Sequence, residues 1–482
     1  MAQNYIIIGR KEEQALFKIY LDSPKAELIA VYGRRRVGKT YLIKSYFKEK
    51  FDFALSGLYD VTKTVQLTQF QKKLEEYSGN AAKRPKDWFE AFDLLSKYLD
   101  TLKKDKIIVF LDEIPWLDTP KSNFLAAFSQ FWNDWASMKT NFKLFVCGSA
   151  TTWMLSKFIG DKGGIYGRVS RSIWLRPFTL LETQKFLKEI KGIDLNQKQV
   201  LSIYMVLGGI PYYLDMLVKG KPLDVNIDEM LFQEGAPLRS EFDFLFRSLF
   251  LNSKIYRSVV TALSQKLKGL TRQELIEILK IKEGGMLTEA LENLAKCDFI
   301  RKYSAIGKTE RDAMYQLTDL FSLFYLKFIS ADNGQEQHFW TKMSGKPQMI
   351  AWSGYAFEQV CLHHTEQIKK SLGISGMVSN IYSWSCRPFT DKNGAEWQGG
   401  QVDLVIDRAD GVINLCEIKY VSGKFAIDTQ YAEHLRERAS LFSVVTKTSK
   451  AIQHTFITTY GVKQNQNSDI VQSEVTAEGL FG

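Results

Sequence analysis

The sequence has 482 residues, of which 45% are hydrophobic and 24% are charged, as is usual for chains that fold into several water-soluble domains. No apolar run approaches the roughly 20 residues that a membrane span requires, and the first residues lack the basic start and apolar stretch of a signal peptide. We therefore expect a cytoplasmic protein with no membrane partner. The formal net charge of +10 is compatible with a polyanionic partner such as DNA.

The cysteines and histidines argue against a zinc site. The five cysteines show no C-x-x-C spacing, so neither a zinc knuckle nor a disulfide framework is indicated. His363 and His364 are neighbours on an expected helix and point about 100° apart, so they cannot both ligate one metal ion. We expect these two histidines in the core or on the surface.

The first ~150 residues alternate short apolar runs with longer amphipathic stretches, which predicts a parallel sheet flanked by helices. The expected strands lie at residues 28–32, 51–55, 107–111 and 142–147. Helical spacing of Phe128, Phe131, Trp132 and Trp135 predicts a packed helix face. Beyond residue 177, helical periodicity at 180–190 and 197–207 predicts a helical lid.

A glycine-rich motif follows the first expected strand and precedes a helical run. Its residues match G-x-x-x-x-G-K-[ST] and are Gly33, Arg34, Arg35, Arg36, Val37, Gly38, Lys39 and Thr40. In such a loop the backbone N–H groups surround phosphates, Lys39 neutralises the β and γ oxygens, and the Thr40 hydroxyl ligates magnesium. The motif predicts ATP and Mg²⁺ as cofactors.

Two acids end the apolar strand expected at 107–111. Asp112 is expected to hold magnesium through its water shell, and Glu113 to polarise the attacking water. An acid next to the magnesium aspartate marks the additional-strand, catalytic-glutamate branch of P-loop ATPases. The alternative is a solvated turn after an apolar strand.

Several motifs together resemble the archaeal-type ATPase family of the AAA+/STAND group. They are I-G-R at 8–10 with Glu13, the P-loop at 33–40, L-D-E at 111–113, C-G-S at 147–149 and G-G-I-P-Y-Y-L at 208–214. The resemblance implies that Ser149 is a sensor at the end of the fourth strand and that the Gly9-Arg10 turn lies near the adenine. The family usually has an acid after that arginine, whereas Lys11 stands here.

An arginine finger is a further candidate. Arg168 or Arg171 could supply it, because a guanidinium matches the charge that develops on a transferred phosphoryl group. A surface arginine without this role is the alternative.

Residues 250–330 predict a winged helix-turn-helix. Three helices at 253–265, 271–279 and 285–296 precede a hairpin of residues 299–303 and 313–317. The third helix, which would read DNA, contains Glu289 and Glu292 against a single Lys296, whereas phosphate approach and base reading favour Arg, Lys, Asn or Gln. A scaffold role therefore outweighs sequence-specific DNA binding.

After a linker expected at 332–337 and a helix at 353–370, a hairpin places acids and a lysine together. Residues 401–407 and 412–420 flank a D-G turn, which brings Asp403 opposite Glu417 and Lys419 within about one residue of register. Such a cluster is expected to bind magnesium between Asp403 and Glu417 while Lys419 orients a water molecule for phosphodiester attack.

This pattern resembles the PD-(D/E)XK nuclease fold. The resemblance implies that Glu358 is an additional metal-ligating acid on the first helix of that fold, and that the domain is of the nuclease-like kind that follows archaeal-type ATPases. Domains of this kind also occur as inactive binding folds, so cleavage and metal-free structure remain alternatives.

The expected fold is α/β: a P-loop parallel-sheet ATPase core at 1–155, a helical lid at 156–249, a winged helix-turn-helix at 250–330 and a restriction-endonuclease-like α/β domain at 331–482. The expected function is a magnesium-dependent ATPase coupled to a DNA-directed nuclease or nuclease-like domain. The alternative is an ATP-dependent regulatory switch or DNA-binding module whose nuclease-like domain cuts nothing. A homo-oligomer or a protein partner is compatible with both.

Overall fold

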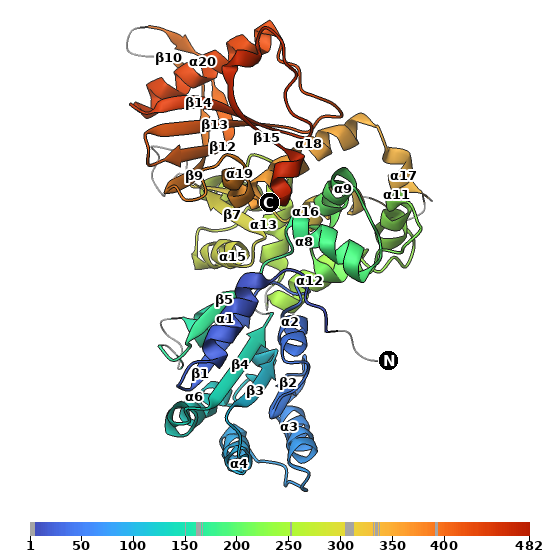
Figure 1. Cartoon of the computed structure of the whole chain (residues 1–482), viewed down its shortest axis with the longest axis vertical. Coiled ribbons are helices and arrows are strands. Elements are labelled where there is room, and N and C mark those ends of the chain that lie inside the picture. The colour runs from blue at the N-terminus through green and yellow to red at the C-terminus, as the bar shows by residue number, and fades with distance from the viewer. Residues whose placement is uncertain are drawn as a thin grey trace. The chain divides into compact units, whose positions relative to one another are not determined.

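The structure is a computed structural model that describes residues 5–149, 151–160, 165, 167–250, 253–303, 313–330, 332, 336, 338–390 and 394–482. It divides into two compact units, which are described in turn (Figure 1). The first comprises Met1–Pro177 with Leu245–Leu251, and the second comprises Phe178–Phe244 with Asn252–Gly482. No helix in the described ranges is both long and apolar enough to cross a membrane.

The first unit is built on a five-stranded parallel sheet with the order β2-β3-β4-β1-β5. The strands are β1 (Glu27–Tyr32), β2 (Phe53–Ser56), β3 (Ile107–Asp112), β4 (Phe142–Gly148) and β5 (Arg171–Trp174). The four expected strands are confirmed to within two residues at each end. Strand β4 lies between β1 and β3, as expected for the additional-strand branch of P-loop ATPases.

Strand β5 was not predicted. It has four residues, of which Arg171 and Ser172 are exposed, so it has no apolar run, and it lies in the segment expected to belong to the lid. Its pairing with β1 extends the sheet of the first unit to residue 174.

Helices cover both faces of this sheet. On one face are α1 (Lys11–Leu21) and α2 (Lys39–Tyr46). Phe17 of α1 and Phe47, which directly follows α2, pack on Phe145 of β4. The other face packs against α3 (Lys63–Ser78), α4 (Trp88–Asp100) and α6 (Phe124–Asp134). The short α5 (Ile114–Leu117) follows β3, and η1 (Ala136–Met138), α7 (Thr151–Trp153) and η2 (Met154–Ile159) flank β4.

The aromatic run on α6 is confirmed as a packed face. Phe128, Phe131 and Trp132 are buried, and the ring of Trp135 stacks on Phe131 with centroids 5.3 Å apart. Together they fill the space between α4, α6 and the sheet.

The second unit begins with helices. They are α8 (Leu180–Lys185), η3 (Phe186–Ile190), α9 (Gln197–Leu207), α10 (Pro211–Asp215), α11 (Leu223–Ile227), η4 (Asp228–Phe232) and the start of α12 (Glu241–Leu249). The expected helices at 180–190 and 197–207 are present, with capping boxes at Thr179 and Asn196 that fix where each begins.

The segment expected to be a winged helix-turn-helix contains three helices and a small sheet. The helices are α13 (Ser253–Gln265), α14 (Arg272–Leu279) and α15 (Gly285–Lys296). The sheet has the order β6-β8-β7, from β6 (Leu270–Thr271), β8 (Met314–Leu317) and β7 (Ile300–Tyr303). The elements thus follow the predicted helix and hairpin positions closely.

The last part of the second unit holds a mixed five-stranded sheet with the order β15-β14-β13-β12-β9. Its strands are β9 (Ser379–Cys386), β12 (Gly400–Arg408), β13 (Val412–Lys419), β14 (Ala451–Thr458) and β15 (Val471–Thr476). Strands β9, β12 and β13 are antiparallel neighbours, whereas β13, β14 and β15 run parallel. Strands β10 (Phe389–Thr390) and β11 (Glu396–Trp397) pair separately.

The second unit contains further helices, some of which lie beside this mixed sheet and others beside the helices of residues 180–232 (Figure 1). They are α16 (Leu320–Phe324), η6 (Tyr325–Ile329), α17 (Phe339–Met343), α18 (Pro347–His363), α19 (Thr365–Ser371), α20 (Thr429–Thr446), η7 (Ser468–Ile470) and η8 (Ala477–Phe481). The single helix expected at 353–370 is two helices, which meet at the buried His364. Most of the linker expected at 332–337 lies outside the described residues; of its positions, Asp332 forms an ion pair with Arg239.

Candidate functional site

The P-loop connects β1 to α2, as the motif predicts. Gly33 has a φ of 148°, and a Cβ there would lie 2.3 Å from the carbonyl oxygen of Leu175, so no side chain fits. Gly38 begins α2 with a φ of 89°. Both positions demand glycine, because the backbone must turn sharply between strand and helix. Of the intervening residues, Arg34 and Val37 are buried, while Arg35 and Arg36 are half-buried.

Lys39 lies buried inside this loop. Its Nζ donates hydrogen bonds to the carbonyl oxygens of Gly33, at 3.0 Å, and Arg34, at 2.9 Å. Burial lowers the pKa of Lys39, and the nearby charge of Glu113 opposes that shift. The loop backbone therefore holds the ammonium group where the motif requires a phosphate-binding charge.

Asp112, at the end of β3, is surrounded by neutral donors. Its Oδ1 accepts hydrogen bonds from the Thr40 hydroxyl at 2.9 Å and the Cys147 thiol at 2.6 Å, and its Oδ2 accepts one from Ser56 at 3.2 Å. Burial, with the charges of Asp112 and Glu113, raises the pKa of Cys147 well above its ordinary value, so the thiol keeps its proton. None of these three donors cancels the charge of the carboxylate.

Thr40 and Asp112 fit a magnesium ion. Both present oxygen atoms, which Mg²⁺ prefers, and the hydrogen bond between them shows that the two oxygens can approach one small cation. The expectation that these residues share a metal is thus compatible with their geometry.

Glu113 is held by Ser149. The Glu113 Oε2 accepts hydrogen bonds from the Ser149 backbone N–H at 3.0 Å and from its hydroxyl at 2.8 Å. Glu113 also has a φ of 46°, a strained backbone region that is common at functional sites. Because β3 and β4 are parallel neighbours, the acid and the sensor expected at their ends lie together.

The Gly9-Arg10 turn lies beside the P-loop. The Arg10 guanidinium donates to the carbonyl oxygen of Arg176 at 2.7 Å, next to the Leu175 carbonyl that faces Gly33. On the other side, the Tyr41 hydroxyl donates to the carbonyl oxygen of Ile6 at 2.8 Å. The turn is therefore placed next to both ends of the phosphate-binding loop.

The two arginine-finger candidates differ in environment. Arg171 begins β5 and is exposed, whereas Arg168 is half-buried in the preceding turn, where its N–H bonds to the carbonyl oxygen of Ile165.

Glu417, on the hairpin of the second unit, has two charged partners and one hydroxyl donor. Its Oε1 is 2.9 Å from the Lys419 Nζ and accepts a hydrogen bond from the Tyr431 hydroxyl. Its Oε2 forms a close ion pair with Arg438. Burial alone would raise the pKa of Glu417, but Arg438 and Lys419 outweigh it and hold the pKa below its ordinary value.

The predicted hairpin register brings Asp403 towards Glu417. Leu404 pairs with Cys416, so Asp403 and Glu417 are the next residues along their strands. Gln401 donates a hydrogen bond to Asp403 Oδ1. Glu358 of α18 is close enough to feel these charges: burial, and next the charge of Asp403, raises the pKa of Glu358 to about 8.

These acids do not form a metal-ligand group. Among the residues that the structure describes, no three His, Cys, Asp or Glu side chains are placed to hold a metal ion together. At Glu417, both carboxylate oxygens already contact cationic or hydroxyl donors. The arrangement therefore does not fit the expected magnesium site at Glu358, Asp403 and Glu417.

Arg301 joins the same cluster from β7. Its guanidinium donates to Ser383 Oγ at 3.0 Å, and that hydroxyl donates to the Asp403 carbonyl oxygen at 2.6 Å. Its Nε also donates to Gln316 Oε1 at 2.6 Å. Burial lowers the pKa of Arg301, opposed among others by the charge of Asp403.

Sequence reasoning missed five residues of these sites. Ser56 could have been found, because β2 ends opposite Asp112 in the parallel register. Cys147 belongs to the C-G-S motif at 147–149, from which only the role of Ser149 was predicted. Tyr431, Arg438 and Arg301 lie on elements whose packing no local pattern reveals.

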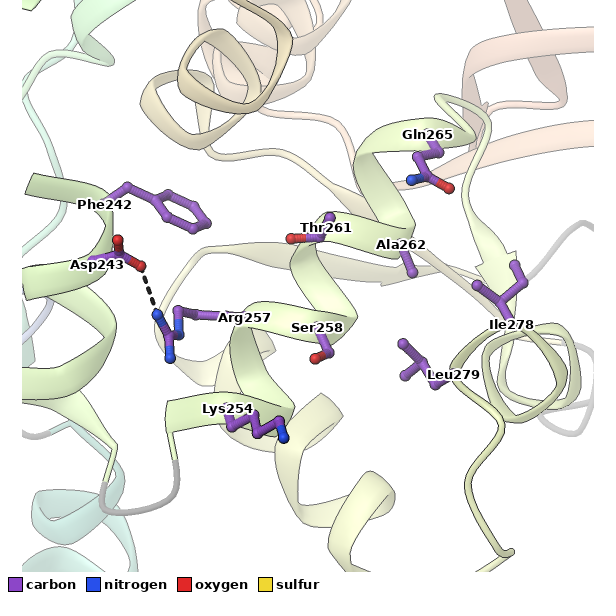
Figure 2. Close-up of a pocket in the computed structure, with 10 residues that line it drawn as sticks. All are labelled: Phe242, Asp243, Lys254, Arg257, Ser258, Thr261, Ala262, Gln265, Ile278 and Leu279. Atoms are coloured by element: carbon purple, nitrogen blue, oxygen red, sulfur yellow. Dashed lines mark hydrogen bonds and ion pairs between the residues drawn. The ribbon is translucent and has the colours of Figure 1, made fainter. Parts of the chain in front are cut away.

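A separate groove of about 440 Å³ follows the outer face of α13 (Figure 2). Figure 2 shows Phe242 and Asp243 on one side and Ile278 and Leu279 of α14 on the other. Arg257 on α13 pairs with Asp243 at 2.6 Å, so an acid offsets part of the basic charge here. The groove contains none of the predicted site residues.

In the first unit, the strand order, the loop after β1 and the acid pair after β3 define the core of a P-loop ATPase. Residues 9–217 match the family described as an ATPase domain predominantly from Archaea. The chain therefore carries an ATP-binding ATPase domain of the archaeal type.

Three known proteins resemble the chain. The uncharacterized protein MJECL04 of Methanocaldococcus jannaschii is 27% identical over 383 residues, which cover 79% of this chain and 82% of that protein. The uncharacterized ATP-binding protein MJ0423 of the same organism is 47% identical over 45 residues, 9% of this chain and 76% of that protein. The solved Walker-type ATPase PABY2304 of Pyrococcus abyssi has a TM-score of 0.49 and 17% identity, covering 68% of this chain and 97% of that one.

Proposed function

We propose that the protein is a magnesium-dependent ATPase in which Glu113 is the general base. The observation that carries this proposal is the pairing of Glu113 with Ser149 beside the Thr40 to Asp112 hydrogen bond, at adjoining strand ends next to the P-loop. A carboxylate held by two donors has a fixed orientation, as a general base requires.

Each residue of the site has a distinct role in hydrolysis. The Lys39 ammonium and the P-loop N–H groups hold the β and γ phosphates. Glu113 takes a proton from a water molecule while the oxygen of that water bonds to the γ-phosphorus. The bond between the γ-phosphorus and the β–γ bridging oxygen breaks, and ADP leaves. Thr40 and Asp112 would hold Mg²⁺, which neutralises charge on the phosphate oxygens. Ser149 orients Glu113, and the Gly9-Arg10 turn lies where it can contact the base or sugar.

The Glu113→Gln variant tests this assignment. It keeps the shape of the side chain and its bonds to Ser149 but cannot accept the proton, so we expect ATP binding to persist and turnover to fall by about 100-fold or more. ATP hydrolysis and ATP binding are measured in parallel, with the exposed Glu76→Gln as control. Full turnover by Glu113→Gln would place the base elsewhere.

An arginine finger from a neighbouring copy of the chain would require a homo-oligomer. Arg171 suits this role better than Arg168, because it is exposed at the start of β5, the edge strand of the sheet. Arg171→Ala is then expected to lower turnover in a manner that depends on protein concentration, and Arg168→Ala serves as its comparison.

For the rest of the chain, we propose that a winged-helix scaffold joins the ATPase to a nuclease-like domain that acts on DNA. Contacts between β7, β8 and the C-terminal domain support the scaffold role. Tyr355 of α18 donates to the Leu267 carbonyl at 3.1 Å, and Arg301 and Gln316 extend this buried network towards β9. The exposed face of α15 carries Glu289 and Glu292, which disfavours DNA.

The nuclease-like domain has two candidate roles: metal-dependent cleavage of DNA, or binding without cleavage under the control of ATP. The ion pairs of Glu417 favour the second, because a catalytic metal needs that carboxylate. Nicking of supercoiled plasmid DNA with Mg²⁺ or Mn²⁺ decides between them. Cleavage by the wild type that Glu417→Ala abolishes would establish the first role.

A further inference from the structure

Helix α20 directs two side chains at Glu417. Asp428 caps the helix by accepting the Tyr431 N–H at 2.8 Å, which fixes its start. Tyr431 and Arg438 are seven residues apart, so they lie on one face of the helix, together with the buried Leu435 and Phe442. That apolar face packs on the mixed sheet, and its two polar members reach Glu417.

The contact between Arg438 and Glu417 is shielded from water. The side chains of Arg438 and Glu417 are 12% and 11% exposed, so little solvent separates their charges. Arg438 takes Oε2, while Lys419 and Tyr431 share Oε1. The Arg438 NH1 also reaches the Gln401 carbonyl oxygen at 3.5 Å, one more tie to β12 beside Asp403.

A divalent cation at Glu417 would have to displace these partners or share the carboxylate with them. Displacing Arg438 would leave a guanidinium charge in a shielded place, which is strongly unfavourable. Sharing the carboxylate would place the positive guanidinium of Arg438 beside the positive metal ion, where water screens their repulsion little. Both routes oppose metal binding, and both opposing terms disappear with the charge of Arg438.

We propose that Arg438 takes the place of a divalent cation at Glu417, so that the C-terminal site is charge-balanced by protein side chains and binds no catalytic metal. Lys419 supplies the second positive charge, and Tyr431 closes the remaining side of the carboxylate. This deepens the proposed non-cleaving role of the nuclease-like domain. It does not depend on the assignment of the ATPase residues.

Manganese binding to the full chain tests this proposal. The background is Asp112→Asn without nucleotide, so that Thr40 and Asp112 do not contribute, and bound Mn²⁺ is counted by the loss of its free electron paramagnetic resonance signal. We expect no binding that depends on Glu417 at millimolar Mn²⁺. Adding Arg438→Met should create a manganese site at Glu417, with an affinity for Mn²⁺ about tenfold or more above that of the Asp112→Asn chain. Adding Glu417→Gln should remove that site again.

Control variants separate charge from packing. Arg438→Gln keeps hydrogen-bonding groups without the charge and should also gain manganese binding, whereas Arg438→Lys keeps the charge and should not. Arg436→Met removes an exposed charge from the same helix and should change nothing. ATP turnover, measured on each Arg438 variant without the Asp112 change, should stay at the wild-type rate.

Two results would overturn the proposal. One is manganese binding by the Asp112→Asn chain that Glu417→Gln abolishes, because the metal would then displace Arg438. The other is a folded Arg438→Met or Arg438→Gln chain that gains no manganese. If Arg438→Met does not fold, the Arg438→Gln variant still tests the proposal. So does the comparison of manganese binding by the Asp112→Asn chain with and without Glu417→Gln. Loss of ATPase activity in Glu113→Gln bears on the other proposal alone.

Discussion

The two units each place a carboxylate with little exposure to solvent near the end of a sheet strand, and the partners of the two carboxylates differ in charge. Asp112 accepts hydrogen bonds from a threonine hydroxyl, a serine hydroxyl and a thiol, all of them neutral. Glu417 meets a guanidinium, an ammonium and a phenol. The first carboxylate keeps a negative charge available for a cation, and the charge of the second is already balanced.

This difference shows that acidic motifs alone do not define a metal site. A cationic partner that already compensates the charge of a carboxylate weakens the attraction of that carboxylate for a divalent cation. Lys39 illustrates the same rule inside the ATPase site. It lies near Asp112 and Glu113, yet its Nζ donates hydrogen bonds to two carbonyl oxygens of the P-loop.

The largest expected effect concerns Lys39. Lys39→Ala removes the charge that meets the phosphates, and we expect ATP affinity to fall by about 100-fold or more, since hydrogen bonds to charged groups are the strong ones. Isothermal titration calorimetry measures it, with the exposed Lys50→Ala as control. Unchanged nucleotide binding would contradict the assignment of Lys39 as the phosphate-binding charge of the first unit.

A pair of matched variants sharpens the contrast between the carboxylates. Asp112→Asn should reduce magnesium-dependent ATP turnover by about 100-fold, because the oxygen that holds the cation loses its charge. Glu417→Gln should leave turnover unchanged over the same range of magnesium concentration. A similar loss in both variants would mean that the two sites are not independent.

Acid sensitivity separates the units as well, because all five histidines follow residue 337. His364 accepts the Leu180 N–H at Nε2, and burial lowers its pKa from 6.5 to about 4. The contribution of neutral His364 to the free energy of unfolding is therefore present above pH 6.5 and is lost as the pH falls towards 4.

The shift corresponds to a stability change on the order of 3 kcal/mol between these limits. Denaturant unfolding of His364→Asn between pH 7 and 4 measures it. The variant should be less stable than wild type at pH 7, and the difference should shrink as the pH falls. The exposed His434→Asn is the control, and parallel pH profiles for wild type and His364→Asn would refute the expectation.

A smaller effect is expected at Ser149. Ser149→Ala removes one of the two hydrogen bonds that hold Glu113, so turnover should fall by about tenfold while ATP affinity is kept. Ser149→Thr retains the hydroxyl and should restore most of the rate. The exposed Ser137→Ala is the control. A variant with reduced ATP affinity but normal turnover would assign Ser149 to nucleotide binding instead.

The smallest expected effect concerns nucleic acid. The net charge of +10 implies that any DNA binding is mainly electrostatic and weakens steeply with salt. Fluorescence anisotropy with a labelled duplex at several salt concentrations measures this. An affinity that does not depend on ionic strength would point to specific base contacts instead.

How much the sequence predicts differs between the two sites for a physical reason. The P-loop is contiguous and its function resides in its backbone, so residues 33–40 identify it directly, and the parallel sheet then brings Asp112 and Ser149 to the same edge. The helix and strand positions of the second unit also follow from local periodicity. The partners of Glu417 do not: Arg438 lies on a helix whose rotation is set by the packing of Leu435 and Phe442.

Other misses have the same origin. Strand β5 is short and half of its residues are exposed, so it has no apolar run, and its strand conformation depends on pairing with β1. Arg301 reaches the C-terminal site because the sheet of the 253–317 segment packs against α18 through Tyr355. Long-range packing decides each case, and no local sequence pattern encodes it.

The most direct test of the contrast is the location of manganese in crystals of the full chain grown with a non-hydrolysable ATP analogue and Mn²⁺. Anomalous scattering marks the metal without assumptions about its ligands. The account predicts a peak next to Thr40 and Asp112 and no peak between Asp403 and Glu417, where Arg438 should remain paired. A manganese peak bound to Glu417, with Arg438 displaced, would contradict it.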